Sequence, residues 1–190
     1  MPIYEPAEDS FLLAKHARKQ LKGILIENPA ARALDMGTGS GIQAEACAES
    51  GVKKKNIFAV DINTEAVKLA KKKGFNAVLS DLFSNISKKR RKEKFDLIIF
   101  NPPYLPEDKT GHDKGKDTTG GRLGDETILR FLRQAKSYLS DNGKILIVIS
   151  SLTPKSRIKK EIEKQNLKCR VLETQTLFFE RLEVWMIEEN

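Results

Sequence analysis

The chain has 190 residues, 39% of them hydrophobic, and a formal net charge of +8. This length suits one compact domain, which we take to span residues 1–190, and it excludes a second domain of ordinary size. The positive charge allows an acidic partner such as nucleic acid. However, no aromatic residues that could stack on bases lie between the lysine runs, which are typical of solvated helix ends and loops.

The cysteines and the apolar runs predict a reduced compartment and no membrane span. The two cysteines, Cys47 and Cys169, are far apart, and they suggest neither a disulfide framework nor a zinc site. The first residues lack the charged-then-apolar pattern of a signal peptide. The longest apolar run, Ile145–Ile149, is too short to cross a bilayer. We therefore expect a cytoplasmic protein without a metal site.

Hydrophobic patterning predicts strands and helices that alternate along most of the chain. The first helix begins near Pro6, in an N-terminal helix region of residues 1–23, because proline suits a first helical turn and Glu8 and Asp9 favour a helix N-terminus. The predicted strands are Ala33–Met36, Asn56–Val60, Asn76–Leu79, Phe95–Phe100, Ile145–Ile149, Lys168–Thr176 and Arg181–Ile187. Further helices are predicted through Ala44–Ala48, through Glu65–Lys73 after an Asn63 cap, through Thr127–Leu139, and from Pro154 to Lys164. An Asn142-Gly143 turn should precede the fifth strand.

This alternation predicts an α/β fold, in which helices cover both faces of a mostly parallel, seven-stranded sheet. No helix separates the last two strands, so they should form a hairpin, and the final strand should run antiparallel to the rest. The apolar run Phe95–Phe100 implies a strand that is buried on both faces.

A glycine-rich segment, Asp35–Gly41, follows the first predicted strand. Glycines here let the backbone turn tightly and let a ligand approach closely, so Gly37 and Gly39 are candidate binding residues. The third glycine comes one residue too early for the dinucleotide fingerprint, which disfavours a nicotinamide dehydrogenase. Asp35 precedes the first glycine, and its carboxylate suits the ammonium of S-adenosylmethionine better than a pyrophosphate.

Two more carboxylates end predicted strands. Asp61 ends the second strand and can accept hydrogen bonds from both hydroxyls of a ribose. Asp81, followed by Leu82, ends the third strand, where an acidic side chain can meet an adenine amino group. A single carboxylate at a strand end is common. Together with the glycine loop, however, the two predict an adenosine-containing ligand.

The tetrad Asn101-Pro102-Pro103-Tyr104 follows the fourth predicted strand. Its prolines fix an extended backbone and remove two donors, which leaves acceptors free. A planar nitrogen is a poor nucleophile, because its lone pair is delocalised. The Asn101 side-chain oxygen and the Pro102 carbonyl can hold its two N–H groups, while Tyr104 can stack on the planar group. We therefore predict N-methylation, with Asn101, Pro102 and Tyr104 as catalytic residues and the whole tetrad, Pro103 included, as the substrate contact.

The tetrad, the Asp35–Gly41 loop and the opening segment Tyr4–Leu13 resemble the HemK-like glutamine methyltransferases, class I enzymes with a Rossmann-like fold. The opening segment is similar to that of the archaeal and eukaryotic branch. The similarity extends to Gly120-Gly121-Arg122 and Glu180-Arg181-Leu182. It implies S-adenosyl-L-methionine as the cofactor. The implied substrate is the glutamine of the Gly-Gly-Gln motif in class I translation release factors.

The resemblance also implies roles for particular residues. The positions that match cofactor contacts are Ser10, Asp35, Gly37, Asp61, Asp81, Leu82 and Asn101. Asn101 also matches the contact to the substrate amide. The length and the glycines of residues 105–125, directly after the tetrad, separately predict a mobile substrate loop, because loops this long are usually functional or disordered.

Members of this branch often work with a small zinc-binding activator protein. The strand Asn76–Leu79 should lie at one edge of the sheet, where its unpaired backbone groups could accept such a partner. The basic run Ser87–Lys94 could meet an acidic surface of that partner.

The tetrad leaves the kind of substrate open, since adenine-N6 and guanine-N2 methyltransferases share it or close variants. The net charge favours nucleic acid as the substrate. The lack of room for a target-recognition domain and of an aromatic stacking surface favours protein. A third alternative is a cofactor-binding regulatory subunit without activity, and the intact tetrad argues against it.

Overall fold

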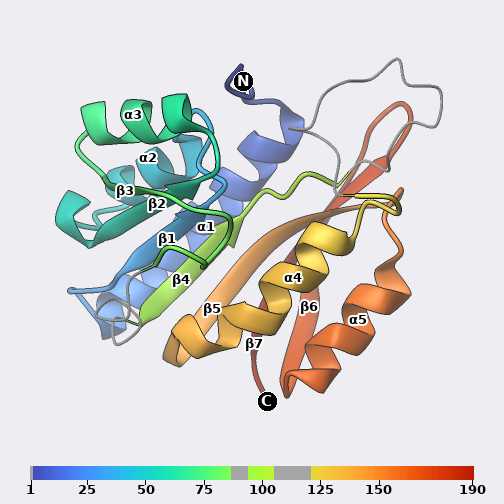
Figure 1. The fold of residues 1–190 in the computed structure, drawn as a ribbon. Helices are drawn as coiled ribbons and strands as arrows, with labels where there is room; N and C mark the ends of the chain where they lie inside the picture. The colour runs from blue at the N-terminus through green and yellow to red at the C-terminus, as the bar shows by residue number, and fades with distance from the viewer. Residues whose placement is uncertain (1, 87–93, 105–120) are drawn as a thin grey trace.

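The computed structural model describes residues 2–86, 94–104 and 121–190. The strands of these residues form one seven-stranded sheet in the order β3-β2-β1-β4-β5-β7-β6 (Figure 1). The strands are β1 (Ala33–Met36), β2 (Ile57–Asp61), β3 (Asn76–Leu79), β4 (Phe95–Phe100), β5 (Leu139–Ser150), β6 (Leu167–Thr176) and β7 (Arg181–Glu189). The helices are α1 (Glu8–Glu27), α2 (Ile42–Glu49), α3 (Thr64–Lys72), α4 (Glu126–Ala135) and α5 (Lys155–Lys164). The predicted substrate loop and the basic run lie outside the described residues, apart from residues 121–125 and Lys94.

The strand directions confirm the predicted fold class. Strands β1 to β5 pair in parallel, and β7 pairs antiparallel with both β5 and β6. Strand β3 lies at one edge of the sheet, as predicted, and β6 lies at the other. The last strand in the sequence is therefore an internal strand of the sheet.

Successive side chains of each strand point to opposite faces of the sheet, so they pack into two hydrophobic layers. Leu34 and Met36 of β1 point into a layer that α4 and α5 cover. Ala33, their neighbour in the strand, points into the opposite layer, which α1 and α2 cover. The helix α3 packs on this second face as well, over Ala59 of β2. Figure 1 shows α4 and α5 together on the near face of the sheet. Among the described helices, none has the length and the apolar character to span a membrane.

The start of β5 differs from the prediction. The structure has no separate turn at Asn142-Gly143, because the strand begins at Leu139 and bulges against β4. Phe95 pairs with Leu139, but Leu97 pairs with Lys144, so the residues between them form the bulge. The backbone of Phe95 approaches Gly143 so closely that a Cβ on Gly143 would lie 2.7 Å from its carbonyl oxygen.

Boundaries of three helices also differ from the prediction. Helix α1 begins at Glu8 after an Ala7 N-cap and runs to Glu27, beyond the predicted N-terminal helix region of residues 1–23. The helix predicted through Thr127–Leu139 ends at Ala135 and continues as a 3-10 turn, Lys136–Tyr138. Pro154 is the N-cap of α5 and not its first helical residue. The cap of α3 is confirmed, since the Asn63 side chain accepts a hydrogen bond from Glu65 N–H.

The strand register brings three loops together at one end of the sheet. Met36 of β1 pairs with Val60 of β2 on one side and with Phe100 of β4 on the other. The residues that end or follow these strands, Gly37, Asp61 and Asn101, therefore emerge side by side. This is the carboxyl end of the parallel strands, where open α/β sheets bind ligands.

Candidate active site

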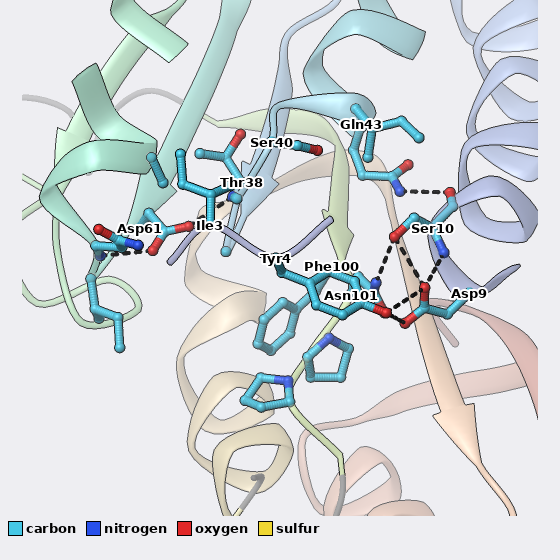
Figure 2. A pocket seen from close by; sticks show the side chains of 18 of the residues that line it. Ile3, Tyr4, Asp9, Ser10, Thr38, Ser40, Gln43, Asp61, Phe100 and Asn101 are labelled. Carbon is cyan, nitrogen blue, oxygen red and sulfur yellow. Dashed lines mark hydrogen bonds between the residues drawn. The ribbon is translucent and has the colours of Figure 1, made fainter. Parts of the chain in front are cut away.

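A cavity of about 430 Å³ lies at this end of the sheet (Figure 2). Its size is that of a typical small-molecule site. The N-terminal segment and the start of α1 form one wall, and the loops after β1, β2 and β4 form the others. The lining residues are Pro2, Ile3, Tyr4, Asp9, Ser10, Gly37, Thr38, Gly39, Ser40, Ile42, Gln43, Asp61, Ile62, Asn63, Ala66, Phe100, Asn101, Pro102, Pro103, Tyr104 and Glu180.

The glycine loop forms the floor of the cavity. Gly37 has φ of +65° and Gly39 has φ of +49°, which is the left-handed region that favours glycine. A Cβ on Gly37 would also lie 3.4 Å from the ring of Phe100, so the loop runs close to the strand that leads into the tetrad. These constraints explain why both glycines are needed where the loop faces the cavity.

Asp35 lies behind this loop and is not among the lining residues. Its carboxylate accepts hydrogen bonds from Thr38 Oγ1 at 2.6 Å and from the backbone N–H of Ala44 at 3.1 Å. Burial raises the pKa of Asp35 to about 7, although these two hydrogen bonds act in the opposite direction. In this structure the side chain holds the glycine loop against α2.

Asp61 lines the cavity, as the sequence predicts. Its Oδ2 accepts the backbone N–H of Gly39 and its Oδ1 accepts that of Asn63, both at 2.8 Å. Each carboxylate oxygen has a second lone pair, so both can accept a further hydrogen bond from a ligand.

The whole tetrad lines the cavity, and Asn101 has the most informative contacts. Its Nδ2 lies 3.3 Å from Ser10 Oγ, so it donates across the cavity wall to the first turn of α1. Its Oδ1 is buried and has no hydrogen-bond partner among the described residues. A buried acceptor without a partner costs about 1–3 kcal/mol, so this oxygen favours a ligand that donates.

Several lining residues had no predicted role in the site. Asp9 was expected only to favour the start of the helix, but its buried carboxylate accepts hydrogen bonds from the hydroxyls of Tyr4, at 3.2 Å, and Tyr104, at 3.3 Å. Burial, together with the negative charge of Asp9, holds the pKa of both tyrosines far above its usual value, so both remain hydroxyl donors. Glu180 also lines the cavity, and it accepts a hydrogen bond from Ser150 Oγ at 2.5 Å. In the sequence, the family resemblance of the opening segment Tyr4–Leu13 was the only feature that could have pointed to Tyr4 and Asp9 as site residues.

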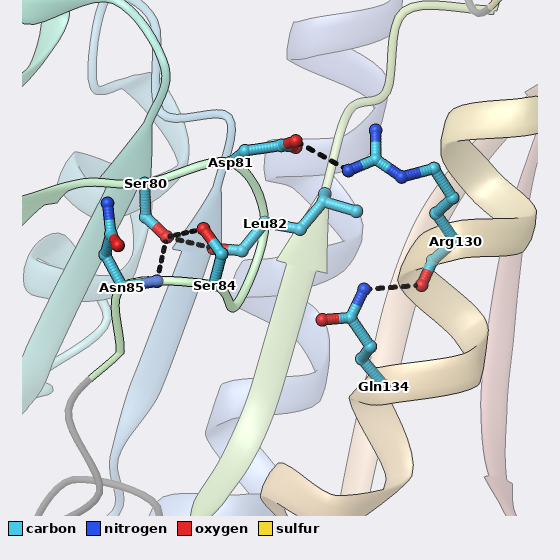
Figure 3. Close-up of polar contacts among 7 residues, drawn as sticks. All are labelled: Ser80, Asp81, Leu82, Ser84, Asn85, Arg130 and Gln134. Carbon is cyan, nitrogen blue, oxygen red and sulfur yellow. Dashed lines mark hydrogen bonds and ion pairs between the residues drawn. The ribbon is translucent and has the colours of Figure 1, made fainter.

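The predicted adenine contacts, Asp81 and Leu82, are not among the lining residues. Asp81 Oδ2 pairs with Arg130 Nη2 of α4 at 2.6 Å, and both side chains are about half exposed (Figure 3). Leu82 is buried although its φ is +49°, a conformation that costs a leucine about 1–2 kcal/mol. Hydrogen bonds from Ser80 Oγ to the Leu82 carbonyl, at 2.8 Å, and from Asn85 N–H to Ser80 Oγ, at 2.9 Å, hold this turn.

Comparisons with known proteins identify the family of the chain. The family model of the methyltransferase small domain matches residues 12–179. A putative protein N5-glutamine methyltransferase of Methanocaldococcus jannaschii is 37% identical over 197 residues, which cover 96% of this chain and 89% of that protein. Methyltransferase HEMK2 of Homo sapiens is 32% identical over 170 residues, and the alignment covers 83% of this chain and 76% of HEMK2.

A similar solved structure is the E. cuniculi Mtq2–Trm112 complex, described as responsible for methylation of the eRF1 translation termination factor. It superposes with a TM-score of 0.72 and 23% sequence identity, and all of both chains is covered.

Proposed function

Because the chain belongs to the methyltransferase small-domain family, we propose that it is an S-adenosylmethionine-dependent enzyme that methylates the side-chain nitrogen of a glutamine in a protein. The substrate we propose is the glutamine of the Gly-Gly-Gln motif of a class I translation release factor. Release factors act in translation, so this substrate places the protein in the cytoplasm. The observation that carries the proposal is the buried Asn101 Oδ1, which lacks a partner among the described residues and belongs to a cavity-lining side chain.

The residues of the cavity fit S-adenosylmethionine. Asp61 offers both carboxylate oxygens to the ribose hydroxyls, and Gly37 and Gly39 let the backbone approach the ligand. Asp35 would act from behind the loop, where the ammonium of a bound cofactor would favour its ionised form and so offset the effect of burial on its pKa.

The strained Leu82 turn and Asp81 lie after β3 and are proposed as the adenine contacts. Ser10, in the first turn of α1, lines the cavity and is proposed as a further cofactor contact.

When bound, the cofactor supplies an electrophilic methyl group on a sulfonium sulfur. Asn101 Oδ1 and the carbonyl of Pro102 accept the N–H groups of the substrate amide, which orients its lone pair toward the methyl group. Tyr104 is half-buried beside them and packs on the planar amide. The methyl group would leave the sulfur with the bonding electrons staying on sulfur, and the methylated nitrogen would release one of its two N–H protons to solvent. This order requires no strong base, because alignment and preorganised acceptors lower the barrier.

The charge of the cavity favours a protein amide over a nucleic-acid amine. The ionisable lining residues with acidic side chains are Asp9, Asp61 and Glu180, and no lysine or arginine occurs among the lining residues that the structure describes. Phosphates next to a target base would be repelled by these carboxylates, whereas a glycine-rich peptide is neutral. The net charge of +8 therefore lies elsewhere on the molecule.

A small activator subunit is the second part of the proposal. Among the described strands, the edge strand β3 pairs with β2 alone, so its outer side faces no other strand of the described sheet. The Leu79 carbonyl accepts a hydrogen bond from the Asn85 side chain at 3.0 Å, and an added strand would have to displace this contact. Leu79 in this strand is 46% exposed, which gives a partner an apolar contact at this edge. The Mtq2–Trm112 complex is a relative in fold that is assembled with a partner. Binding of zinc would be a property of that partner.

The test is methyl transfer from labelled S-adenosylmethionine to separate substrates: a class I release factor, tRNA, rRNA and DNA. We expect label in the release factor alone. A release factor with the motif glutamine changed to alanine is the matched control, and it should take up no label. Label in nucleic acid, or equal label in the alanine variant, would contradict the proposal.

A further inference from the structure

Hydrogen bonds connect Asp9, Ser10 and Asn101 along one wall of the cavity (Figure 2). Ser10 Oγ donates to Asp9 Oδ1 at 3.0 Å, and Asn101 Nδ2 donates to Ser10 Oγ at 3.3 Å. Asp9 is 4% exposed and Ser10 is 2% exposed, so water has little access to these groups. The connection therefore links the first turn of α1 directly to the tetrad after β4.

The carboxylate of Asp9 determines the direction of both hydrogen bonds. A carboxylate only accepts hydrogen bonds, so the Ser10 hydroxyl has to donate its single proton to Asp9. The backbone N–H of Ser10 also donates to the same oxygen, at 2.5 Å, which holds the carboxylate in place. The Ser10 oxygen then offers only lone pairs to Asn101.

An amide side chain has a donor end and an acceptor end of nearly the same shape, so packing alone does not select its orientation. Because Ser10 offers lone pairs, Asn101 must turn its Nδ2 toward Ser10. Its Oδ1 is the end without a partner among the described residues. In the reverse orientation, Nδ2 would meet the N–H groups of a substrate amide, and a donor would face a donor.

We propose that Asp9 is a positioning residue that acts through Ser10 and keeps the oxygen of Asn101 turned toward the substrate nitrogen. The inference rests on the proposed function for the identity of the substrate. It gives Asp9 a role in the reaction, and it gives the hydroxyl of Ser10 a role besides a cofactor contact. Tyr104 Oη donates a hydrogen bond to Asp9 Oδ2 at 3.3 Å, so the carboxylate of Asp9 also contacts the last residue of the tetrad.

The test compares Asp9→Asn, Ser10→Ala and Ser10→Thr with the wild type. Asp9→Asn keeps the size of the side chain but adds a donor, which removes the fixed direction of the hydrogen bonds. We expect kcat to fall at least about tenfold for Asp9→Asn, while KM for the release factor and Kd for the cofactor change less than about threefold. Ser10→Thr retains the hydroxyl and should keep kcat within about threefold of the wild type. In a Ser10→Ala background, Asp9→Asn should have a much smaller effect, because the connection is already broken.

The matched control is Glu49→Gln, which removes a carboxylate from an exposed ion pair with Arg18 and should leave every constant unchanged. A readout without turnover is the NMR signal of the Asn101 side-chain NH2, which Asn101→Ala identifies by its loss. Ser10→Ala and Asp9→Asn should each shift this signal, and Glu49→Gln should not. If Asp9→Asn does not fold, Ser10→Ala and Ser10→Thr make the same comparison.

The outcomes separate this inference from the proposed function. If Asn101→Ala abolishes turnover but Asp9→Asn has a normal kcat, the positioning role is wrong and the proposed function stands. If the wild type transfers no methyl group to the release factor, the proposed function is wrong. If the wild type is active and Asn101→Ala retains turnover, Asn101 takes no part in the reaction and the positioning role of Asp9 is wrong. An Asn101 NH2 signal that is unchanged in Ser10→Ala would overturn the inference even without any turnover. Equal losses in kcat, cofactor affinity and thermal stability for Asp9→Asn would show a structural role only.

Discussion

The backbone N–H of Gly39 donates to Asp61 Oδ2 at 2.8 Å, so the glycine loop after β1 is tied to the end of β2. Together with the hydrogen bond from Asn63 N–H to Asp61 Oδ1, this contact fixes the orientation of the carboxylate in the cavity wall. A cofactor that binds here therefore meets an acceptor that is already oriented, which reduces the entropy lost on binding.

From this arrangement we predict that Asp61→Ala weakens S-adenosylmethionine binding by roughly 1.5–3 kcal/mol, because the ribose loses a charged acceptor. At saturating cofactor, kcat should change little. Calorimetry measures the affinity, and Asp141→Ala is the control, since Asp141 is exposed at the bulge of β5. An unchanged affinity in Asp61→Ala would remove this residue from the cofactor site.

Asn101→Ala should lower kcat strongly and leave the affinity for the cofactor nearly unchanged, the reverse of Asp61→Ala. The variant loses the acceptor for the substrate amide, and a preorganised contact of this kind contributes on the order of 3 kcal/mol, or about a hundredfold in kcat. Cofactor affinity should stay within a few fold. Single-turnover kinetics with the release factor measure the loss, and a variant with near-normal turnover would exclude Asn101 from the reaction.

Stability should depend on pH through Asp35. Its folded pKa of about 7 lies above the ordinary value of 3.8, so between these pH values the folded state keeps a proton that the unfolded chain has released. The stability that this group contributes is therefore complete at low pH and is lost as the pH rises toward 7. Relative to Asp35→Asn, the wild type should lose roughly 2–3 kcal/mol between pH 5 and pH 7. Urea unfolding of both proteins at each pH measures the difference, and parallel curves would contradict the prediction.

Gly143→Ala should destabilise the fold by about 1–3 kcal/mol. The added Cβ would meet backbone atoms, 2.7 Å from the Phe95 carbonyl oxygen and 2.9 Å from Ser140 N, and neither can move without disrupting the bulge. Gly23→Ala is the matched control, because a Cβ there meets nothing within 4 Å and Gly23 lies inside α1. That control should stabilise the protein by roughly 0.5–1 kcal/mol. Thermal unfolding of the two variants should give shifts of opposite sign.

The activator proposal predicts that Val78→Lys in β3 blocks co-purification of the small partner, since the lysine puts a charge on the edge strand where the partner would add. Val171→Lys provides the control, because Val171 is 49% exposed in β6, the strand at the opposite edge. It should leave the partner bound. Equal loss of the partner in both variants, or full activity without any partner, would rule the proposal out.

Much of the fold could be predicted from local pattern. The bounds of β1, β3 and β4 agree with the prediction residue for residue, because each is a short apolar run with polar or glycine residues after it. The start of β5 could not be predicted, because the bulge depends on how closely Gly143 approaches Phe95 of another strand.

The site could be predicted where a residue follows a strand, and less well elsewhere. Asp61 and Asn101 emerge from neighbouring strands, so their place in the sequence predicts their place in the cavity. Asp9 had no such signal, because its contact with Tyr104 joins residues 95 positions apart. Asp35 was expected to face the ligand, but the left-handed turn at Gly37 carries the loop in front of it. Its direct contact with the cofactor stays a proposal.

The position of β7 has a consequence for biosynthesis. It is the last strand in the sequence, yet β5 and β6 both need it, because each pairs with β7 and not with the other. Until Arg181–Glu189 has been synthesised, β6 has no partner within the sheet, and one side of β5 is left open. A nascent chain that stalls before this point exposes the open side of the apolar strand β5 to aggregation. A truncation of this segment would therefore remove the strand that joins β6 to β5, and not a strand at the edge of the sheet.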